Sequence, residues 1–359
     1  MKADPRCRSN RPWGRLFVVG CWMALAPASS SVLLGTQQPP ASSPEGIRSF
    51  GKRQQENALR VGIIGLDTSH AVAFTQILND PKDPNHVPGA RVVCAFKGGS
   101  PDVVASRTRV DGFTKQLVEK YGIEIVESIP ALCEKVDAVL LESVDGRRHL
   151  EQVRPVFAAK KRVFIDKPLA GSWKDGREIV RLSKESGTPF FSASSERFTD
   201  SLRKTMADPA LGKPRGCDAF SVCLLEPHHP DLFWYGVHGV ETLYAVMGTG
   251  CESVQRLHTA DTDVVVGRWK DGRVGTFRGT RKGAGAFGAT IFGEKAALST
   301  LTIPDDHGYR NLLVEVVKFF RSGKAPVSAE EMLEVLAFMQ AADLSKEKGG
   351  LEARLDELQ

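Results

Sequence analysis

The sequence lacks the close cysteine pairs that mark a zinc site or a redox motif. Its seven cysteines are spread over 359 residues, and none lies in a Cys-x-x-Cys arrangement. A structural zinc site is therefore not expected. Cys217, Cys223 and Cys251 are near enough in sequence to permit a disulfide in an exported chain, but we expect buried free thiols.

The chain also has little net charge of either sign. Its 48 basic and 43 acidic side chains give a formal charge of +5, and the two signs alternate, as from Arg177 to Glu185, without a long basic stripe. A nucleic-acid partner is therefore not expected. The 42% hydrophobic and 25% charged residues are ordinary for a globular protein, and the length favours two domains.

No apolar run is long enough to span a membrane comfortably. The run from Leu16 to Ala28 follows four arginines, which is the order of a secretory signal peptide, and small residues at its end predict cleavage after residue 28. We therefore expect an exported protein, periplasmic or extracytoplasmic. The alternatives are a lipoprotein cleaved before Cys21 and a cytoplasmic protein with a misplaced start codon. Residues 29–58 are rich in Ser, Pro, Gly and Gln and predict a linker.

Strands and helices alternate between residues 59 and 190. Short apolar runs predict strands at Arg60 to Leu66, Ala90 to Phe96, Ile123 to Val126 and Asp137 to Glu142, and helices after residue 68, at Phe113 to Tyr121 and at Pro130 to Glu134. Asp67, Thr68 and Ser69 are candidate N-caps for the first helix. The alternation predicts an α/β fold with a parallel, doubly wound sheet of the Rossmann type. Its ligand crevice would lie at the carboxyl ends of the strands.

Residues 191–345 are expected to form a second, α+β domain with a large, mainly antiparallel sheet. Alternating runs predict strands at Cys217 to Leu225, Ser253 to His258, Val264 to Trp269, Val274 to Gly279 and Ala286 to Phe292. A turn at residues 270–272 and a glycine cluster at 283–288 separate several of them, as in hairpins.

Three motifs, in chain order, resemble those of the Gfo/Idh/MocA family of oxidoreductases. Ser143-Val144-Asp145 with His149 resembles the family's Thr-Pro-Asn loop and its downstream His. From Val163, VFIDKPLAGSWKDGREIVRLSKESGTPFFSASSERF resembles the family's strand ending in Glu-Lys-Pro, with Asp166 in place of Glu and with Lys167, Pro168, Arg197 and Phe198 matching. Residues 317–349 resemble the closing helices that return to the first domain. The resemblance covers roughly Arg60 to Gly350.

The resemblance implies transfer of hydride between NAD or NADP and a small sugar, polyol or related hydroxy compound. The segment LEPHHPDLFWYGVHGVETLYAVMG is similar to the family's Asp-x-Gly-x-His-x-x-Asp helix: Gly236 and His238 match, while Trp234 and Glu241 stand at the two Asp positions. In relatives this His moves the proton of the substrate hydroxyl that the Lys of Glu-Lys-Pro binds. The expected catalytic residues are Lys167, His238 and Glu241, with Asp231 as an alternative carboxylate, and Arg197, Trp234 and Tyr235 are expected at the substrate.

The dinucleotide fingerprint is incomplete. Of the three glycines of G-x-G-x-x-G, Gly65 remains, whereas Asp67 and His70 replace the other two. Asp67 would repel a phosphate unless it turns away to cap the helix, and His70 would offset its charge. Lys97 and Ser100 follow the second strand, where relatives hold the ribose with an acid, and this favours NADP. The expected cofactor residues are Gly65, Asp67, Thr68, Ser69, His70, Lys97, Ser143, His149, Asp166 and Lys167.

Three other interpretations remain open from the sequence. One is a nucleotide- or sugar-binding protein of the same fold without catalysis, and another is a lyase or hydrolase that uses a retained nicotinamide transiently. His228, His229, Asp231 and His238 supply imidazole and carboxylate groups that suit a divalent metal, but their spacing does not force them onto one site, and no metal is expected. The second-domain sheet is a candidate surface for a homo-oligomer.

Overall fold

The computed structural model describes residues 58–304 and 306–358, which all belong to one compact unit. The expected signal peptide and nearly all of the expected linker lie outside these residues. No helix within the described ranges is both long and apolar enough to cross a membrane.

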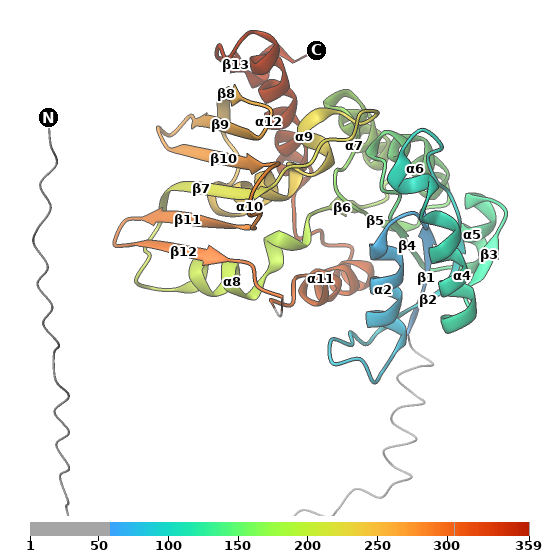
Figure 1. Cartoon of the computed structure of the whole chain (residues 1–359). Helices are drawn as coiled ribbons and strands as arrows, with labels where there is room; N and C mark the ends of the chain where they lie inside the picture. The colour runs from blue at the N-terminus through green and yellow to red at the C-terminus, as the bar shows by residue number, and fades with distance from the viewer. Residues whose placement is uncertain (1–57, 305, 359) are drawn as a thin grey trace, which may run out of the picture. The chain divides into compact units, whose positions relative to one another are not determined.

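The first half of this unit is a six-stranded sheet whose strand pairs are all parallel, in the order β3-β2-β1-β4-β5-β6 (Figure 1). Its strands are β1 (Leu59–Ile64), β2 (Ala90–Phe96), β3 (Glu124–Val126), β4 (Ala138–Leu141), β5 (Arg162–Ile165) and β6 (Phe190–Ser192). All four residues of β4 are buried, because a central parallel strand is covered by helices on both faces. The prediction of a Rossmann-type sheet is confirmed.

Helices connect these strands and pack in two groups. They are α2 (Ser69–Asn79), α3 (Val104–Arg107), α4 (Val110–Tyr121), α5 (Ile129–Lys135), α6 (His149–Ala158) and α7 (Trp173–Ser186). α2 contacts α4, whereas α6 contacts both α5 and α7. Of the three candidate caps, Thr68 is the N-cap of α2: its hydroxyl accepts a hydrogen bond from the His70 N–H, at 3.4 Å. The short helix α3 was not expected.

The second half contains a seven-stranded sheet in the order β12-β11-β7-β10-β9-β8-β13. Its strands are β7 (Pro214–Val222), β8 (Cys251–His258), β9 (Thr262–Trp269), β10 (Val274–Thr280), β11 (Gly288–Gly293), β12 (Ala297–Leu301) and β13 (Ala353–Arg354). The sheet is mostly antiparallel, and the expected hairpin at residues 270–272 joins β9 to β10. The prediction of a large, mainly antiparallel sheet is confirmed, and among the described strand pairs of this sheet β10 and β7 are the parallel pair. The glycine cluster therefore lies in a connection that passes over β7 and not in a hairpin, since β11 pairs with β7 and β12.

Helices from the second half of the chain join the two sheets. They are α8 (Asp200–Ala207), α9 (Asp231–Trp234), α10 (Val237–Met247), α11 (Gly308–Ser322) and α12 (Ala329–Glu347). α10 packs on β7 and β10 and α12 on β8, while α11 also touches α2 and α12 also touches α7. The α7–α12 approach requires Gly176, because a Cβ there would lie 2.3 Å from the Leu336 side chain. The five described cysteines are buried and free, as expected.

Candidate active site between the two sheets

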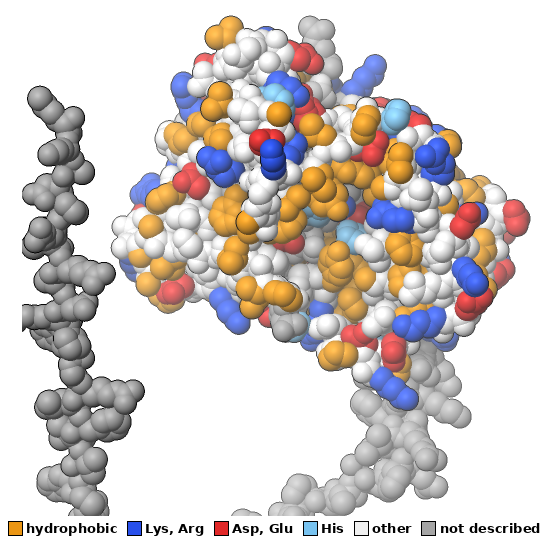
Figure 2. Space-filling model, viewed as in Figure 1, with side chains coloured by type: hydrophobic (Ala, Val, Ile, Leu, Met, Phe, Trp, Pro, Cys, Tyr) orange, Lys and Arg blue, Asp and Glu red, His pale blue; other side chains and the backbone are white. Residues whose placement is uncertain are grey.

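A cavity of about 880 Å³ lies between the carboxyl edge of the first sheet and the second sheet. Among the residues that line it are Thr68 and His70 from the first half, Lys167 after β5, and Tyr235 and His238 from the second half. The space-filling view shows a hollow here, with histidine and hydrophobic side chains at its walls (Figure 2). Its volume suits a small molecule together with part of a nucleotide.

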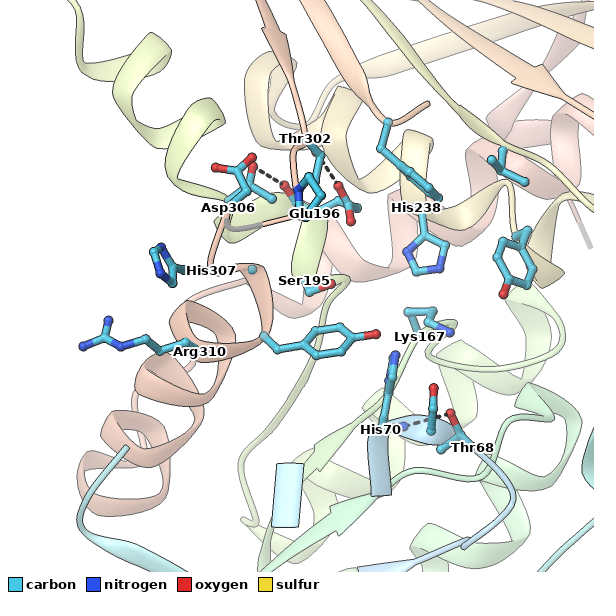
Figure 3. Close-up of a pocket in the computed structure, with 18 of the residues that line it drawn as sticks. Thr68, His70, Lys167, Ser195, Glu196, His238, Thr302, Asp306, His307 and Arg310 are labelled. Atoms are coloured by element: carbon cyan, nitrogen blue, oxygen red, sulfur yellow. Dashed lines mark hydrogen bonds between the residues drawn. The ribbon is translucent and has the colours of Figure 1, made fainter. Parts of the chain in front are cut away.

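Lys167 and His238 enter this cavity from opposite halves of the molecule. Lys167 is the second residue after β5, and His238 lies in the first turn of α10. In Figure 3 the Lys167 side chain lies between His70 and His238. Both side chains therefore line the same cavity, as a catalytic pair would have to.

The surroundings of His238 keep its imidazole neutral. Burial, followed by the positive charges of Lys167 and His70, holds the pKa of His238 well below its usual range. Its Nδ1 is 2.8 Å from the Ser194 hydroxyl, and its Nε2 has no hydrogen-bond partner among the described residues. A neutral imidazole that is oriented through one nitrogen can accept a proton at the other.

His70 and Asp166 form a buried pair beside Lys167. His70 Nδ1 lies 2.8 Å from Asp166 Oδ2, and Lys167 Nζ lies 3.8 Å from the same oxygen. Although burial alone would raise it, the charges of His70 and Lys167 lower the pKa of Asp166. The His70 ring is held between Phe74, stacked at 5.2 Å, and Tyr309, edge-on at 4.9 Å. His70 therefore forms part of the cavity wall. The glycine that usually stands at this position would instead allow the helix to pack closely on the strand.

Asp67 is turned away from the cavity. It is fully buried and accepts hydrogen bonds from Ser106 Oγ at 2.6 Å and from the Val144 N–H at 3.0 Å. The expected repulsion of a phosphate is thereby reduced, although Thr68 and not Asp67 caps the helix. The contact also ties α3 to the loop after β1.

The cavity wall fits an anionic nucleotide at the start of α2. Thr68 and Ser69 at the N-terminus of this eleven-residue helix line the cavity, and so does Arg109 at the start of α4. A helix N-terminus and a guanidinium both favour phosphate groups. Gly65 keeps the loop tight: its φ is +91°, and a Cβ there would lie 2.3 Å from Ser143 Oγ. We conclude that the residues fit NAD even without the second and third glycines.

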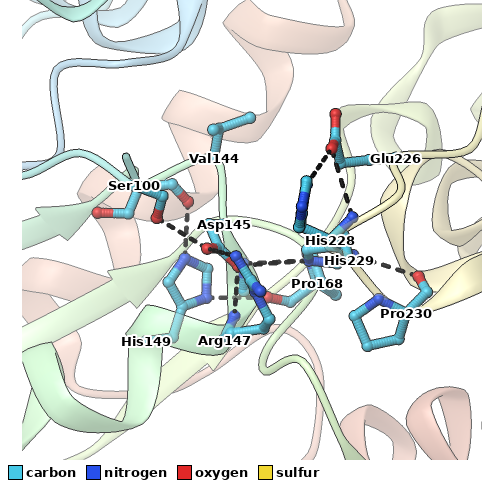
Figure 4. Close-up of polar contacts among 12 residues, drawn as sticks. Ser100, Val144, Asp145, Arg147, His149, Pro168, Glu226, His228, His229 and Pro230 are labelled. Carbon is cyan, nitrogen blue, oxygen red and sulfur yellow. Dashed lines mark hydrogen bonds and ion pairs between the residues drawn. The ribbon is translucent and has the colours of Figure 1, made fainter. Parts of the chain in front are cut away.

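Two residues that were expected at the cofactor, Ser143 and His149, do not line the cavity and instead contact neighbouring loops. His149 is fully buried; its Nε2 lies 2.8 Å from the Ser143 carbonyl and its Nδ1 lies 3.0 Å from the Pro168 carbonyl (Figure 4). It therefore connects the loop after β4 to the loop after β5. Ser143 is buried against Gly65, and its hydroxyl has no partner among the described residues.

The residues that favoured NADP have partners of their own. Lys97 is half-exposed and pairs with Asp111 at 2.6 Å. Ser100 is buried and donates to Asp145 at 2.7 Å, and Arg147 donates to the same carboxylate (Figure 4). Although burial opposes it, these hydrogen bonds lower the pKa of Asp145. Neither Lys97 nor Ser100 lines the cavity.

Glu241 and Arg197 lie away from the cavity wall. Arg197 Nε is 2.7 Å from Glu241, its Nη1 is 2.5 Å from Glu331, and both members of the first pair are almost fully buried. The structure thus couples Glu241 to a guanidinium and not to His238. Trp234 and Tyr235 do line the cavity, and the Tyr235 ring lies 5.6 Å from that of His238.

The alternative set of metal ligands does not converge. His229 is buried, where Gly146 N–H donates to its Nε2 at 3.3 Å, whereas the exposed His228 faces Glu226 (Figure 4). Asp231 pairs with Arg256 and Lys346. His238 lies apart, in the cavity. Each of these four groups has its own partners.

Several residues that line the cavity or hold its side chains in place were missed from the sequence. Ser194 orients His238, Tyr309 packs on His70, Arg109 lines the nucleotide end, and Glu196 lines the wall while accepting a hydrogen bond from Thr302 at 2.8 Å. Ser194 is two residues past the end of β6, so its position after a parallel strand was the available signal. Tyr309 and Arg109 belong to helix termini that no motif marked.

Part of the chain matches a known family and a curated relative. Residues 59–194 match the family model described as "Oxidoreductase family, NAD-binding Rossmann fold", the Gfo/Idh/MocA family. The chain is 26% identical to a myo-inositol 2-dehydrogenase of Thermotoga maritima over 289 residues, which cover 65% of this chain and 85% of the relative.

Solved structures share the whole fold. A probable dehydrogenase from Thermotoga maritima matches with a TM-score of 0.67 at 22% identity, covering 84% of this chain and 100% of its own. A scyllo-inositol dehydrogenase from Lactobacillus casei with bound NAD(H) and scyllo-inositol matches with a TM-score of 0.67 at 16% identity, covering 83% and 99%. At these identities the likeness shows the fold alone. The family match shows that residues 59–194 are an NAD-binding Rossmann domain of the Gfo/Idh/MocA oxidoreductase type, and the shared architecture extends the likeness in fold to the second half of the described chain.

Proposed function

We propose that this protein is an NAD-dependent oxidoreductase that transfers hydride to or from a hydroxyl-bearing carbon of a cyclic polyol or sugar. The observation that carries the proposal is the convergence of Lys167 and a neutral His238 in one cavity that reaches the N-terminus of α2. The inositol dehydrogenases among its relatives support the substrate class.

The chain's own residues supply binding and proton transfer. Lys167 lines the cavity, so its ammonium group can bind the substrate oxygen there. Its positive charge stabilises the negative charge that develops on this oxygen. His238 takes the hydroxyl proton at Nε2, while Ser194 holds the ring through Nδ1. Bound NAD supplies a hydride acceptor at its nicotinamide ring. Trp234 and Tyr235 offer aromatic surface against which the apolar face of a sugar or inositol ring packs.

NAD is preferred over NADP in this proposal. The lysine after β2 that would meet a 2′-phosphate is paired with Asp111. The N-terminus of α2 and Arg109 support a pyrophosphate, which both nucleotides share. Affinity for NADH should therefore exceed affinity for NADPH.

A binding protein that has lost catalysis is the second candidate function. The specific observation in its favour is the contact between Asp67 and Ser106, which holds α3 beside the degenerate glycine loop. If this contact closed the nucleotide site, the cavity would retain a polyol without oxidising it.

Native mass spectrometry of protein purified without added nucleotide tests the proposal. We expect a fraction that carries NAD or NADH, and turnover when inositols and hexoses are supplied with NAD. Absence of bound nucleotide, together with calorimetry that detects polyol but not NADH binding, would establish the binding protein instead. Binding of NADH without turnover on any polyol or sugar would contradict the substrate class alone.

We also propose that the open face of the second sheet joins two copies of the chain. Strand pairing places Val266, Val274 and Phe292 on the face opposite α10 and α12, and all three are exposed. Exposed apolar side chains gathered on one sheet face favour association. Light scattering should give a dimer or larger species for the wild type and a monomer for Val266→Lys/Phe292→Lys; a monomeric wild type would contradict this.

A further inference from the structure

Three ligating side chains meet at the carboxyl edge of the first sheet, beside Lys167. His70 lies in the first turn of α2, Glu142 directly follows β4, and Asp166 directly follows β5. Their strands are neighbours in the sheet, and the backbone ladder continues through them: the Glu142 N–H donates to the Ile64 carbonyl at 2.7 Å and the Asp166 N–H to the Leu141 carbonyl at 2.8 Å. The topology itself therefore brings these side chains together.

The spacing of their ligand atoms suits a single cation. One nitrogen of His70 and one oxygen each of Glu142 and Asp166 lie within 4.8 Å of one another. His70 Nδ1 is 2.8 Å from Asp166 Oδ2 and 3.9 Å from Glu142 Oε2. Ligand atoms bonded to one ion at about 2.1 Å are roughly 3 to 4 Å apart, so small shifts would close the site.

Glu142 is the residue of this cluster whose carboxyl group is buried without a hydrogen-bond partner in the part of the chain that the structure describes. Its side chain is fully buried, and neither Oε1 nor Oε2 has a hydrogen-bond partner among the described residues. Asp166 is also buried, and the nearest cation to its Oδ2 apart from His70 is Lys167 Nζ, at 3.8 Å. A buried carboxylate without a partner is costly unless it is paired or coordinates a metal. Two carboxylates and one imidazole leave room for a positive ligand that is not a side chain.

We propose that His70, Glu142 and Asp166 bind a divalent cation of the Mn²⁺ type. Mixed imidazole and carboxylate ligands suit Mn²⁺ and Zn²⁺, whereas ions that prefer thiolate ligands would bind here weakly. His70 lines the cavity, so the ion stands at its floor beside Lys167. Phe74 and Tyr309 contact the His70 ring on two sides, and its Nδ1 points toward Asp166. This site shares no residue with the set of candidate metal ligands His228, His229, Asp231 and His238.

The test is Mn²⁺ binding by the full-length, untagged protein after chelator treatment. Electron paramagnetic resonance measures free Mn²⁺ directly, and elemental analysis gives the bound amount. We expect about one Mn²⁺ per chain, and Glu142→Gln should weaken its binding at least about tenfold. Adding Mn²⁺ should also raise the melting temperature of the wild type but not that of Glu142→Gln.

Glu196→Gln is the matched control. Glu196 is a largely buried carboxyl of the same cavity that lies outside the cluster, so this variant should bind Mn²⁺ like the wild type. If Glu142→Gln fails to fold, Asp166→Asn makes the same comparison at the second carboxylate. Wild-type protein that binds no Mn²⁺, or cluster variants that bind it as tightly as the wild type, would overturn the proposal. These readouts do not depend on NAD or on turnover, so they stand apart from the proposed activity.

Discussion

At the scale of single residues, Lys167 and His238 are expected to act on the transition state and not on nucleotide binding. We predict that Lys167→Ala and His238→Ala each lower turnover by roughly two to four powers of ten, as removal of a general acid, a base or an electrostatic group does. Affinity for NADH, measured by calorimetry, should be nearly unchanged. Loss of NADH binding in Lys167→Ala would recast Lys167 as a cofactor anchor.

Glu241→Gln separates proton transfer from support of the fold. Because Glu241 pairs with the buried Arg197, we expect this variant to lose stability while the folded fraction keeps its turnover. Thermal melts and turnover per folded molecule distinguish the two effects. An inactive but stable Glu241→Gln, together with an active His238→Ala, would move the proton relay to the carboxylate.

Gly65 is predicted to be the one glycine of the fingerprint that the fold itself requires. Its φ is +91°, and a Cβ there would lie 2.3 Å from Ser143 Oγ and 2.4 Å from the Ser143 nitrogen. Gly122 also has a positive φ, of +64°, but a Cβ there meets nothing within 4 Å. Gly65→Ala should therefore lower the free energy of unfolding by at least about 2 kcal/mol more than Gly122→Ala does. If denaturant titrations gave equal losses of unfolding free energy for Gly65→Ala and Gly122→Ala, the loop after β1 would be able to shift and accommodate the added Cβ.

At the scale of elements, Asp67 holds α3 and the loop after β4 in place around the start of α2. Its carboxylate accepts from Ser106 and from the Val144 N–H. We predict that Asp67→Gly lowers NADH affinity about tenfold, because two hydrogen bonds to a buried carboxylate are lost and both segments are released. Asp67→Asn keeps an acceptor oxygen and should retain most of the affinity.

The opposite result at Asp67 is equally informative. Tighter NADH binding by Asp67→Gly in calorimetry would mean that the carboxylate only tolerates a nearby phosphate. It would also favour the view that the contact with Ser106 holds the nucleotide site closed. No change in either variant would place the nucleotide away from this loop.

The elements that periodicity predicted are those whose burial is decided locally. The fully apolar run of β4 and the run of β1 from Val61 onward read directly as buried parallel strands. α3 is four residues long and has no side-chain cap, so no pattern marked it. The parallel pairing of β10 with β7 depends on a crossover between distant segments, which turn chemistry does not encode.

The site was predictable where a motif fixed both identity and position. Lys167 and His238 were found through the family's motifs, and the cavity brings them together. Glu142 was seen only as part of a strand end, because its role depends on which strands are neighbours in the sheet. Lys97 was predicted to bind the cofactor because it follows the second strand. Its ion pair with Asp111 of α4 could not be predicted, because it depends on how α4 packs beside that strand end.

At the scale of the whole molecule, His229 forms a contact between the two halves. Its side chain is fully buried; its Nε2 accepts from the Gly146 N–H at 3.3 Å, and its Nδ1 lies 3.2 Å from the Pro230 carbonyl. This arrangement requires a neutral ring that is protonated at Nδ1. Burial lowers the pKa of His229 to about 4 from an ordinary value of 6.5. The contact should therefore fail in acid.

The direction of the pH effect follows from proton linkage. Between about pH 6.5 and about pH 4 the unfolded chain binds a proton at His229 that the folded chain does not, so stability falls as the pH falls through this window. At 1.36 kcal/mol for each tenfold difference in proton affinity, we predict a loss of about 3 kcal/mol from this residue. His229→Gln keeps a hydrogen-bonding side chain but cannot titrate. The difference in unfolding free energy between wild type and His229→Gln should therefore shrink by about 3 kcal/mol from pH 7 to pH 4.

The neighbouring His228 provides the control for this last prediction. His228→Gln also removes one imidazole, but its side chain is half-exposed and does not bridge the two halves. Denaturant titrations at several pH values should thus give a wild-type-like pH profile for His228→Gln and a flatter one for His229→Gln. Parallel profiles for all three proteins would show that His229 binds its proton equally well in the folded and the unfolded chain, and acid sensitivity would then belong to other groups such as the carboxylates. A flatter profile confined to His229→Gln would assign the acid-sensitive joint between the two halves to this single ring.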